Sequence, residues 1–300
     1  MFTRWKIIAA CLLAVVSAAA GVRGGEVAAQ PQNCPDLYVV AVPGTWETSH
    51  SDPGKGMLAL IADRLPGNVR TDYVQYAATA FPWEGEVYGR SKREALDAAR
   101  GLVAGVAHTC AATRIAVLGY SQGADAAGDL AAEIGTGLGV VAAHRVVLVG
   151  LIADPRRSPT DTLIGPPVPG AGAAGPRLGG FGLLTPRTYT FCATGDLYCT
   201  MPDSDIAGFT VQLSNPDPAA IGSYHQQMAD IFGDALEAGG LGVLTEELTP
   251  SAYQQRRQQI GDFLKSGAHQ SYPNYPIDSV GNTPLSWLRQ RLLEVIHGPG

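Results

Sequence analysis

Short apolar segments alternate with amphipathic segments over most of this 300-residue chain, and this alternation limits the folds that it can adopt. The clearest apolar segment is Leu37–Val42, a continuous run of the kind that forms a parallel strand buried on both faces. Strands that alternate with amphipathic helices build a parallel sheet with helices on both faces. We therefore predict an α/β fold with a central parallel five-stranded sheet, whose strands lie at residues 37–42, 69–76, 114–119, 145–152 and 188–192.

Helices are predicted where apolar residues recur at helical spacing between these strands. The clearest start is Ser91, because Ser91 and Glu94 have the spacing of a capping box and an apolar stripe follows them. Further helices are expected at residues 55–65, 122–134 and about 283–296.

Two stretches interrupt the alternation. Residues 153–186 hold seven prolines and seven glycines, which predicts a long irregular loop. Residues 202–267 predict a helical insertion, and one of its helices carries an apolar stripe made of Met228, Ile231, Phe232, Ala235 and Leu236. This stripe either packs on the core or lines a groove as part of a lid.

The first thirty residues predict a signal peptide and a spacer. Residues 1–6 carry two positive charges, and the almost wholly apolar segment 7–20 is too short to span a bilayer. Ala18 and Ala20 supply an Ala-x-Ala cleavage pattern, and an uncleaved short anchor is the alternative. We expect an exported protein with one folded domain over residues 31–300.

Composition excludes two classes of protein. Hydrophobic residues make up 46% of the chain and charged residues 16%, which excludes a disordered chain. The net charge of −6 argues against nucleic acid as a partner, since nucleic-acid-binding proteins carry basic patches.

Four of the five cysteines lie beyond the predicted signal peptide, at Cys34, Cys110, Cys192 and Cys199. An even number in an exported protein predicts two disulfides, and four cysteines allow three pairings. A local Cys192–Cys199 bridge is the simplest choice and leaves Cys34 to pair with Cys110. A zinc site is the alternative, although no histidine lies at ligand spacing from either pair.

The sequence Gly119-Tyr120-Ser121-Gln122-Gly123 has the G-x-S-x-G pattern. The pattern alone is short, but here it follows a predicted strand and precedes a predicted helix, as a nucleophile elbow requires. We therefore predict that Ser121 is a catalytic nucleophile. The alternative is an ordinary strand-to-helix turn with a capping serine.

A nucleophilic serine needs a histidine base and a carboxylate, which follow it along the chain in this fold. His269 is the preferred base because it precedes the last predicted helix, whereas His297 lies close to the chain end and His225 opens a predicted insertion helix. Asp196 is the preferred acid, since a Cys192–Cys199 bridge would hold its loop after the fifth strand. Asp154, after the fourth strand, is the alternative acid.

Four motifs together resemble the cutinase family of serine esterases, an α/β-hydrolase family. They are Gly119-Tyr-Ser-Gln-Gly-Ala124, Gly195-Asp-x-x-Cys199, His269-Gln-Ser-Tyr272 and Val42-Pro-Gly-Thr-Trp-Glu47. The resemblance spans about residues 34–296 and implies the same two disulfide pairings. It also implies that Thr45 belongs to the oxyanion hole, for which we expect the backbone amide of Gln122 as the second donor.

Two further segments, Leu151-Ile-Ala-Asp-Pro-Arg-Arg157 and Gly179-Gly-Phe-Gly182, narrow the resemblance. They resemble the cell-envelope branch of cutinase-like proteins in mycolic-acid-producing actinobacteria, which implies phospholipase or thioesterase activity in envelope lipid metabolism.

One departure from the family pattern affects the choice of the histidine base. In small cutinases the acid and the histidine are close in sequence, whereas here the predicted insertion separates Asp196 from His269, and His225 would give a shorter spacing.

These residues imply an esterase that cleaves lipid esters or thioesters through an acyl-enzyme, as a phospholipase A, thioesterase or carboxylesterase. An acyltransferase that moves the acyl group to a sugar or lipid alcohol would use the same residues. A catalytically silent envelope-binding protein is a third hypothesis, but it predicts a lost catalytic position and none is found. We expect no metal and no cofactor, a monomer, and peripheral contact with the membrane or cell envelope.

Overall fold

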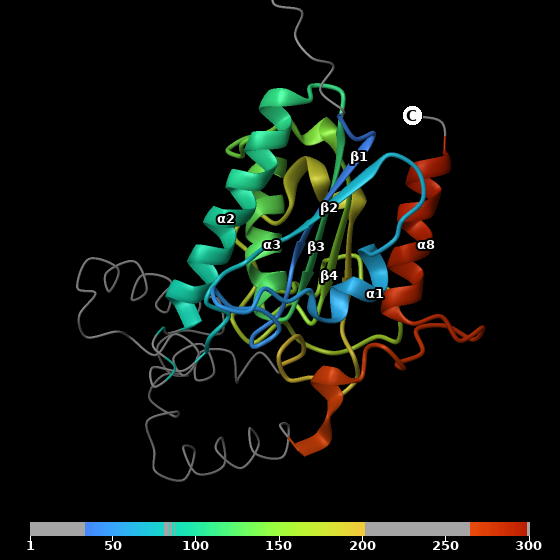
Figure 1. Cartoon of the computed structure of the whole chain (residues 1–300). Coiled ribbons are helices and arrows are strands. Elements are labelled where there is room, and N and C mark those ends of the chain that lie inside the picture. The colour runs from blue at the N-terminus through green and yellow to red at the C-terminus, as the bar shows by residue number, and fades with distance from the viewer. Residues whose placement is uncertain (1–33, 81–83, 85, 87, 202–264, 299–300) are drawn as a thin grey trace, which may run out of the picture. The chain divides into compact units, whose positions relative to one another are not determined.

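A five-stranded parallel sheet forms the centre of the computed structural model, which describes residues 34–80, 84, 86, 88–201 and 265–298 (Figure 1). The strands lie in the order β2-β1-β3-β4-β5, and every neighbouring pair is parallel. Their bounds are β1 Leu37–Val42, β2 Val69–Tyr73, β3 Arg114–Tyr120, β4 Val146–Ile152 and β5 Thr188–Phe191. The predicted α/β fold with its five strands is confirmed.

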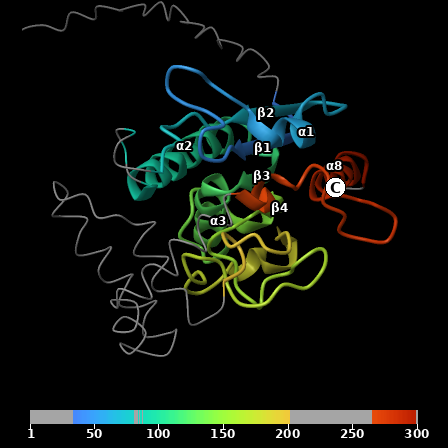
Figure 2. The same ribbon diagram turned by 90° about the horizontal axis from the view of Figure 1, so that it is seen from below.

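Helices cover both faces of the sheet, as Figure 2 shows from below. Helices α2 (Tyr88–Thr109) and α3 (Gln122–Gly135) pack on one face. The short α1 (Ala59–Ala62) and the C-terminal α8 (Pro284–His297) pack on the other. Thr283 caps α8, its side chain accepting a hydrogen bond from the amide of Ser286.

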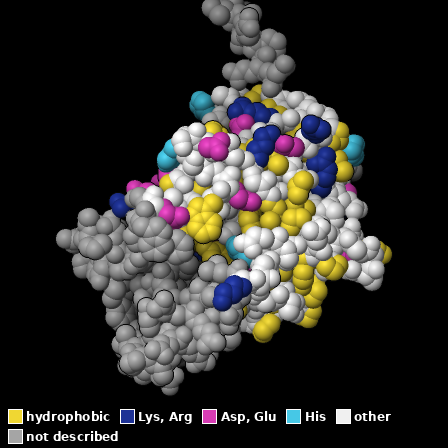
Figure 3. All heavy atoms as spheres, turned by 60° about the horizontal axis from the view of Figure 1, so that its bottom comes forward, with side chains coloured by type: hydrophobic (Ala, Val, Ile, Leu, Met, Phe, Trp, Pro, Cys, Tyr) yellow, Lys and Arg dark blue, Asp and Glu magenta, His cyan; other side chains and the backbone are white. Residues whose placement is uncertain are grey.

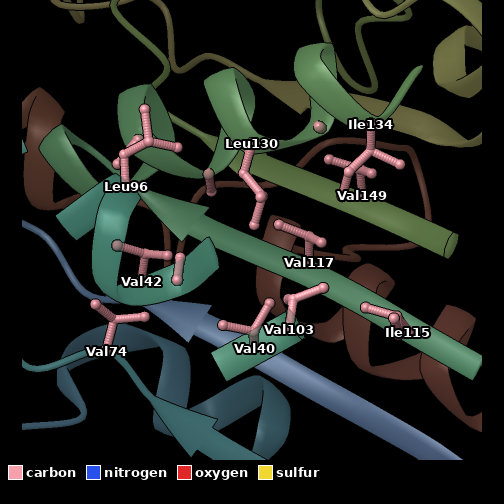
Figure 4. Close-up of a cluster of buried hydrophobic side chains, with 14 of the residues drawn as sticks. Val40, Val42, Val74, Leu96, Val103, Ile115, Val117, Leu130, Ile134 and Val149 are labelled. Atoms are coloured by element: carbon pink, nitrogen blue, oxygen red, sulfur yellow. The ribbon is translucent and has the colours of Figure 1, made fainter. Parts of the chain in front are cut away.

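The alternating side chains of each strand divide the core into two clusters. In β1, Tyr38, Val40 and Val42 face α2 and α3, whereas Leu37, Val39 and Ala41 face α1 and α8. Figure 4 shows the first cluster, in which Val40 and Val42 lie near Val103 of α2 and Leu130 of α3. Burial on both faces explains why β1 reads as a continuous apolar run in the sequence.

The predicted capping box at Ser91 is wrong, because α2 begins three residues earlier, at Tyr88. Ser91 is buried inside the helix, where its Oγ accepts a hydrogen bond from the Thr79 amide at 3.1 Å. Glu94 accepts one from the Ala77 amide, also at 3.1 Å. Both side chains therefore satisfy the backbone of the segment after β2 rather than the end of their own helix.

Several predicted bounds also shift. The helix expected at residues 55–65 is only a 3₁₀ turn at Gly56–Leu58 followed by α1, because Asp63 is extended and Arg64 has a positive φ. β2 ends at Tyr73, β4 begins at Val146, and β5 ends at Phe191.

The irregular stretch 153–186 is tied to α3 by buried charges. The guanidinium of Arg177 donates to Asp154 Oδ2 at 2.5 Å and to Asp129 Oδ1 at 2.9 Å, with 4% of its side chain exposed. A Cβ at Gly128 would lie 2.3 Å from the Arg177 guanidinium carbon, so only glycine leaves room for this arginine. Lys92 of α2 pairs with Asp129 as well.

Two predicted segments lie outside the described residues, namely the signal peptide with its spacer and residues 202–264 of the helical insertion. The insertion and its lid therefore stay predictions. The described residues all belong to one unit, Asn33–Gly300. Among them, no helix combines the length and apolar character that crossing a membrane requires.

Candidate active site

Ser121 lies at the sharp turn between β3 and α3, at the carboxyl edge of the sheet. Its backbone is strained, with φ 57° and ψ −126°, and only 4% of the residue is exposed. The turn requires both flanking glycines. A Cβ at Gly119 would lie 2.5 Å from the Gly123 carbonyl oxygen, and one at Gly123 would lie 2.0 Å from the Val42 oxygen. This is the strand–turn–helix geometry of a nucleophile elbow.

His269 reaches Ser121 from the other end of the chain. It lies on a short 3₁₀ helix, Ala268–Gln270, and its Nε2 is 2.8 Å from Ser121 Oγ. Tyr120, the residue before the serine, donates from its hydroxyl to the His269 carbonyl oxygen at 2.7 Å. The Tyr120 ring stacks on the imidazole, with ring centroids 5.4 Å apart. Tyr120 thus holds both the backbone and the ring of His269.

Asp196 faces the other nitrogen of this histidine. His269 Nδ1 lies 3.0 Å from Asp196 Oδ2 and 3.1 Å from Oδ1, and Asp196 is fully buried. Because a carboxylate only accepts hydrogen bonds, Nδ1 carries the hydrogen and Nε2 presents its lone pair to Ser121. The structure therefore brings together the three residues that the sequence singled out.

Two further donors fix the Asp196 carboxylate. The hydroxyl of Tyr272 donates to Oδ2 at 2.5 Å, and the amide of Tyr198 donates to Oδ1 at 3.0 Å. Burial, followed by the charge of Asp196, raises the pKa of Tyr272 well above its usual value, so its hydroxyl stays protonated. In the sequence, Tyr272 was recognised only as a position of the motif that begins at His269. Its spacing of three residues from His269 on a tight turn could have suggested this contact.

The cysteines form the two disulfides expected, Cys34–Cys110 and Cys192–Cys199. All four cysteine sulfurs are therefore bonded in disulfides. The first bridge joins the residues before β1 to the end of α2. The second closes the loop that carries Asp196, directly after β5.

Loss of one disulfide should mainly lower activity, and loss of the other should mainly lower stability. We expect Cys192→Ser with Cys199→Ser to lower esterase kcat more than stability, since the short loop contributes only about 2 kcal/mol. The matched pair Cys34→Ser with Cys110→Ser opens a far longer loop and should cost about 4 kcal/mol while specific activity stays intact. Thermal melts and initial rates on both variants measure this. A large loss of stability with full specific activity in the Cys192/Cys199 variant would contradict the assigned role.

The alternative residues are engaged elsewhere or lie outside the described part. Asp154 is buried against Arg177. His297 is exposed, and its Nδ1 lies 2.8 Å from the Leu293 carbonyl oxygen. His225 lies outside the described residues.

The two residues expected in the oxyanion hole belong to segments that lie next to Ser121. β1 and β3 pair with Val42 opposite Gly119, so the turn that contains Thr45 follows β1 beside the elbow. A Cβ at Gly44 would lie 3.2 Å from Ser121 Cβ. Gln122 is the first residue of α3, where helix geometry leaves the backbone amide without a partner in the helix.

Glu47 fixes this turn, and sequence reasoning gave it no role. Its carboxylate accepts from the Gly44 amide at 2.9 Å and from the Met57 amide at 2.8 Å. Burial raises the pKa of Glu47, and these two amides oppose the rise. Gly56 packs closely against the Glu47 carboxylate, since a Cβ at Gly56 would lie 2.1 Å from Glu47 Oε2.

Comparison with known proteins identifies the family of the chain. A family model described as Cutinase matches residues 33–212, more than half of the chain. A carboxylesterase Culp6 homolog from Corynebacterium glutamicum is 31% identical over 218 residues, covering 61% of this chain and 71% of that protein.

A solved structure with low sequence identity has the same fold. Lysin B from Mycobacteriophage D29 superposes with a TM-score of 0.51 at 15% identity, covering 87% of this chain and 99% of that one. The catalytic core of acetyl xylan esterase from Trichoderma reesei gives a TM-score of 0.47 at 19% identity, covering 67% and 99%. With its parallel sheet and its strand–serine–helix turn, this chain belongs to the cutinase family and is a carboxylic ester hydrolase.

Proposed function

We propose that the chain is an exported serine esterase that cleaves lipid ester or thioester bonds, with Ser121, His269 and Asp196 as its catalytic triad. The observation that carries the proposal is the hydrogen-bonded chain from Asp196 through His269 to Ser121, with Nδ1 at 3.0 Å and Nε2 at 2.8 Å. The nucleophile is thus within proton-transfer distance of its base at a nucleophile elbow, and the acid is within hydrogen-bond distance of that base.

The reaction follows from these roles. Ser121 Oγ attacks the carbonyl carbon while its proton passes to His269 Nε2, and Asp196 stabilises the imidazolium. The tetrahedral intermediate collapses, the bond to the leaving group breaks, and that group takes the proton from Nε2. A water molecule then attacks the acyl-enzyme, gives its proton to Nε2, and releases the acid as Oγ departs and is reprotonated.

The oxyanion of both intermediates would be held by the backbone amides of Gln122 and Thr45. One such donor is typically worth about 3 kcal/mol of transition-state stabilisation. Glu47 supports this role because it fixes the turn that contains Thr45.

An apolar substrate is supported by the residues beside the site. Trp46, next to Thr45, is 66% exposed, although large aromatic residues are usually buried. Figure 3 brings the end of the molecule with the Ala268–Gln270 turn forward and shows hydrophobic side chains gathered in the middle of that face, next to a histidine. Export is supported by the two disulfides, which persist in oxidising compartments.

A chain-length series of p-nitrophenyl esters tests the proposed substrate class. We expect kcat/KM to rise from acetate to long acyl chains, because a longer chain buries more apolar surface on the enzyme. Hydrolysis of a phospholipid and of an acyl thioester is measured beside it. A preference for acetate with no activity on either lipid substrate would contradict a lipid esterase, and acyl transfer to an added alcohol in preference to water would replace it with an acyltransferase.

A further inference from the structure

Arg157 ends a motif that the sequence singled out, residues 151–157, and the function proposed above gives it no role. Its side chain is among the largest that are fully buried, with 2% of the residue exposed. A charged side chain is rarely buried to this extent unless it is paired with an opposite charge. Arg177, for example, is buried against the carboxylate of Asp154.

The partners of the Arg157 guanidinium are of another kind. In the described part of the chain, every hydrogen bond of this side chain goes to a backbone carbonyl oxygen. Nε donates to the carbonyl of Cys199 at 2.7 Å. Nη2 donates to the carbonyls of Gly170 at 2.5 Å and Pro169 at 3.3 Å, and Nη1 donates to that of Ser158 at 3.4 Å. One guanidinium thus joins a segment that follows β4 to a segment that follows β5.

The segment after β5 is the acid loop, by which we mean the residues that the Cys192–Cys199 disulfide encloses, Asp196 among them. Cys199 closes this loop, and its amide donates to the Asp196 carbonyl oxygen at 3.2 Å. The Thr200 amide donates to the same oxygen at 3.1 Å. Arg157 therefore anchors the residue whose amide bonds to the backbone of Asp196.

Neutral hydrogen bonds connect the same two segments beside Arg157. The Ala173 amide donates to the Tyr198 carbonyl at 2.9 Å, and Thr200 Oγ1 donates to the Pro169 carbonyl at 2.5 Å. Hydrogen bonds from a charged donor are stronger than neutral ones, and those of Arg157 are formed out of contact with water. We therefore expect the guanidinium to contribute most to holding the end of the acid loop in place.

We propose that Arg157 is a positioning residue for Asp196, which holds the acid loop where the Asp196 carboxylate meets His269 Nδ1. This meeting requires an exact placement, because both carboxylate oxygens face Nδ1, at 3.0 and 3.1 Å. Supporting contacts must keep catalytic groups within about 0.5 Å of their productive geometry. The inference rests on the proposed function, since it assumes that Asp196 orients the catalytic base.

Arg157→Lys tests this role while it keeps the positive charge. An ammonium group lacks the planar fork of the guanidinium, so it cannot bond to the Cys199 and Gly170 carbonyls in the same way. We expect kcat for p-nitrophenyl butyrate to fall roughly tenfold, because a hydrogen bond from a charged group is lost. KM should change less than about twofold, because the acid orients the base and does not bind the ester. Wild-type kcat in a folded Arg157→Lys variant would overturn the proposal.

A second measurement separates the positioning of Asp196 from a general effect on the fold. In Asp196→Asn the imidazole has lost its orienting carboxylate, so a residue that acts through this carboxylate has nothing left to position. Adding Arg157→Lys to Asp196→Asn should therefore lower the remaining rate less than about twofold. The same roughly tenfold loss in both backgrounds would show that Arg157 supports the fold in general, and it would overturn the proposal.

Arg145→Lys is the matched control, because Arg145 makes the same kind of contact at the other disulfide. Its Nη2 donates to the Cys110 carbonyl at 2.7 Å, as Arg157 Nε does to the Cys199 carbonyl. Arg145 directly precedes β4, so it lies at the amino edge of the sheet, opposite the edge that carries Ser121. We expect Arg145→Lys to lower the melting temperature and to keep the wild-type kcat. A fall in kcat as large as in Arg157→Lys would overturn the proposal.

Thr200→Val decides the question if Arg157→Lys does not fold. It removes the neutral bond from Thr200 Oγ1 to the Pro169 carbonyl and leaves the buried guanidinium in place. We expect a smaller fall in kcat, about threefold, with KM unchanged. Wild-type kcat in Thr200→Val would in that case overturn the proposal.

The single variant Asp196→Asn distinguishes failure of this inference from failure of the proposed function. Full activity of Asp196→Asn would overturn the proposed triad and the role of Arg157 together. A strong loss of kcat in Asp196→Asn, with wild-type kcat in Arg157→Lys, would overturn only the role of Arg157.

Discussion

Ser121→Ala should reduce ester hydrolysis by about 10⁴-fold or more, to the background left by binding and the oxyanion hole. The fold should persist, because the change removes one oxygen atom from an elbow whose shape is set by Gly119 and Gly123. Initial rates with p-nitrophenyl butyrate and a thermal melt measure both expectations. Activity within tenfold of the wild type would show that another residue is the nucleophile.

A control for Ser121→Ala must rule out a general effect of removing a serine hydroxyl. Ser51→Ala serves this purpose, since Ser51 is exposed in the loop before α1 and its Oγ contacts only Ser49 Oγ among the described residues. We expect it to keep both the wild-type rate and the wild-type melting temperature.

His269→Ala should lower kcat about as far as Ser121→Ala, because the members of a triad act as a unit. Its Nε2 lies 2.8 Å from Ser121 Oγ, and without it the hydroxyl has no base to take its proton. The double variant Ser121→Ala with His269→Ala should be no slower than either single variant. If the rate loss of the double variant equalled the product of the two single losses, this would contradict a shared proton-transfer step.

Two histidines serve as controls for this choice of base. His225→Ala and His297→Ala should each keep most of the activity, the latter because His297 is exposed near the end of α8. A collapse of kcat in His225→Ala, with His269→Ala active, would transfer the role of base to His225.

The fold could be predicted from the sequence largely because burial on both faces leaves a simple signature. β1 and β4 are continuous apolar runs, and so is β3 after Arg114. The bounds of these strands shift by a residue or less. The helix starts were harder. Ser91 and Glu94 have capping-box spacing, but they accept hydrogen bonds from the amides of Thr79 and Ala77. These amides belong to the segment before the helix and not to its first turn.

In the candidate site, too, local features could be predicted from the sequence and contacts between distant segments could not. Ser121 was predictable because its elbow is local, with strand, glycines and helix all within a few residues. Glu47 and Tyr120 were not assigned roles, because each acts across segments that only the fold brings together. Tyr120, for example, bonds to His269, which lies 149 residues away along the chain.

Mass spectrometry after reaction with a fluorophosphonate tests most directly whether Ser121 is the activated nucleophile of this esterase. One phosphonyl group should add to the wild-type protein, and peptide mapping should place it on Ser121. Ser121→Ala should take up none, and His269→Ala should react far more slowly, because the hydroxyl then lacks its base. A label on any other residue, or equal labelling of wild type and Ser121→Ala, would contradict the account.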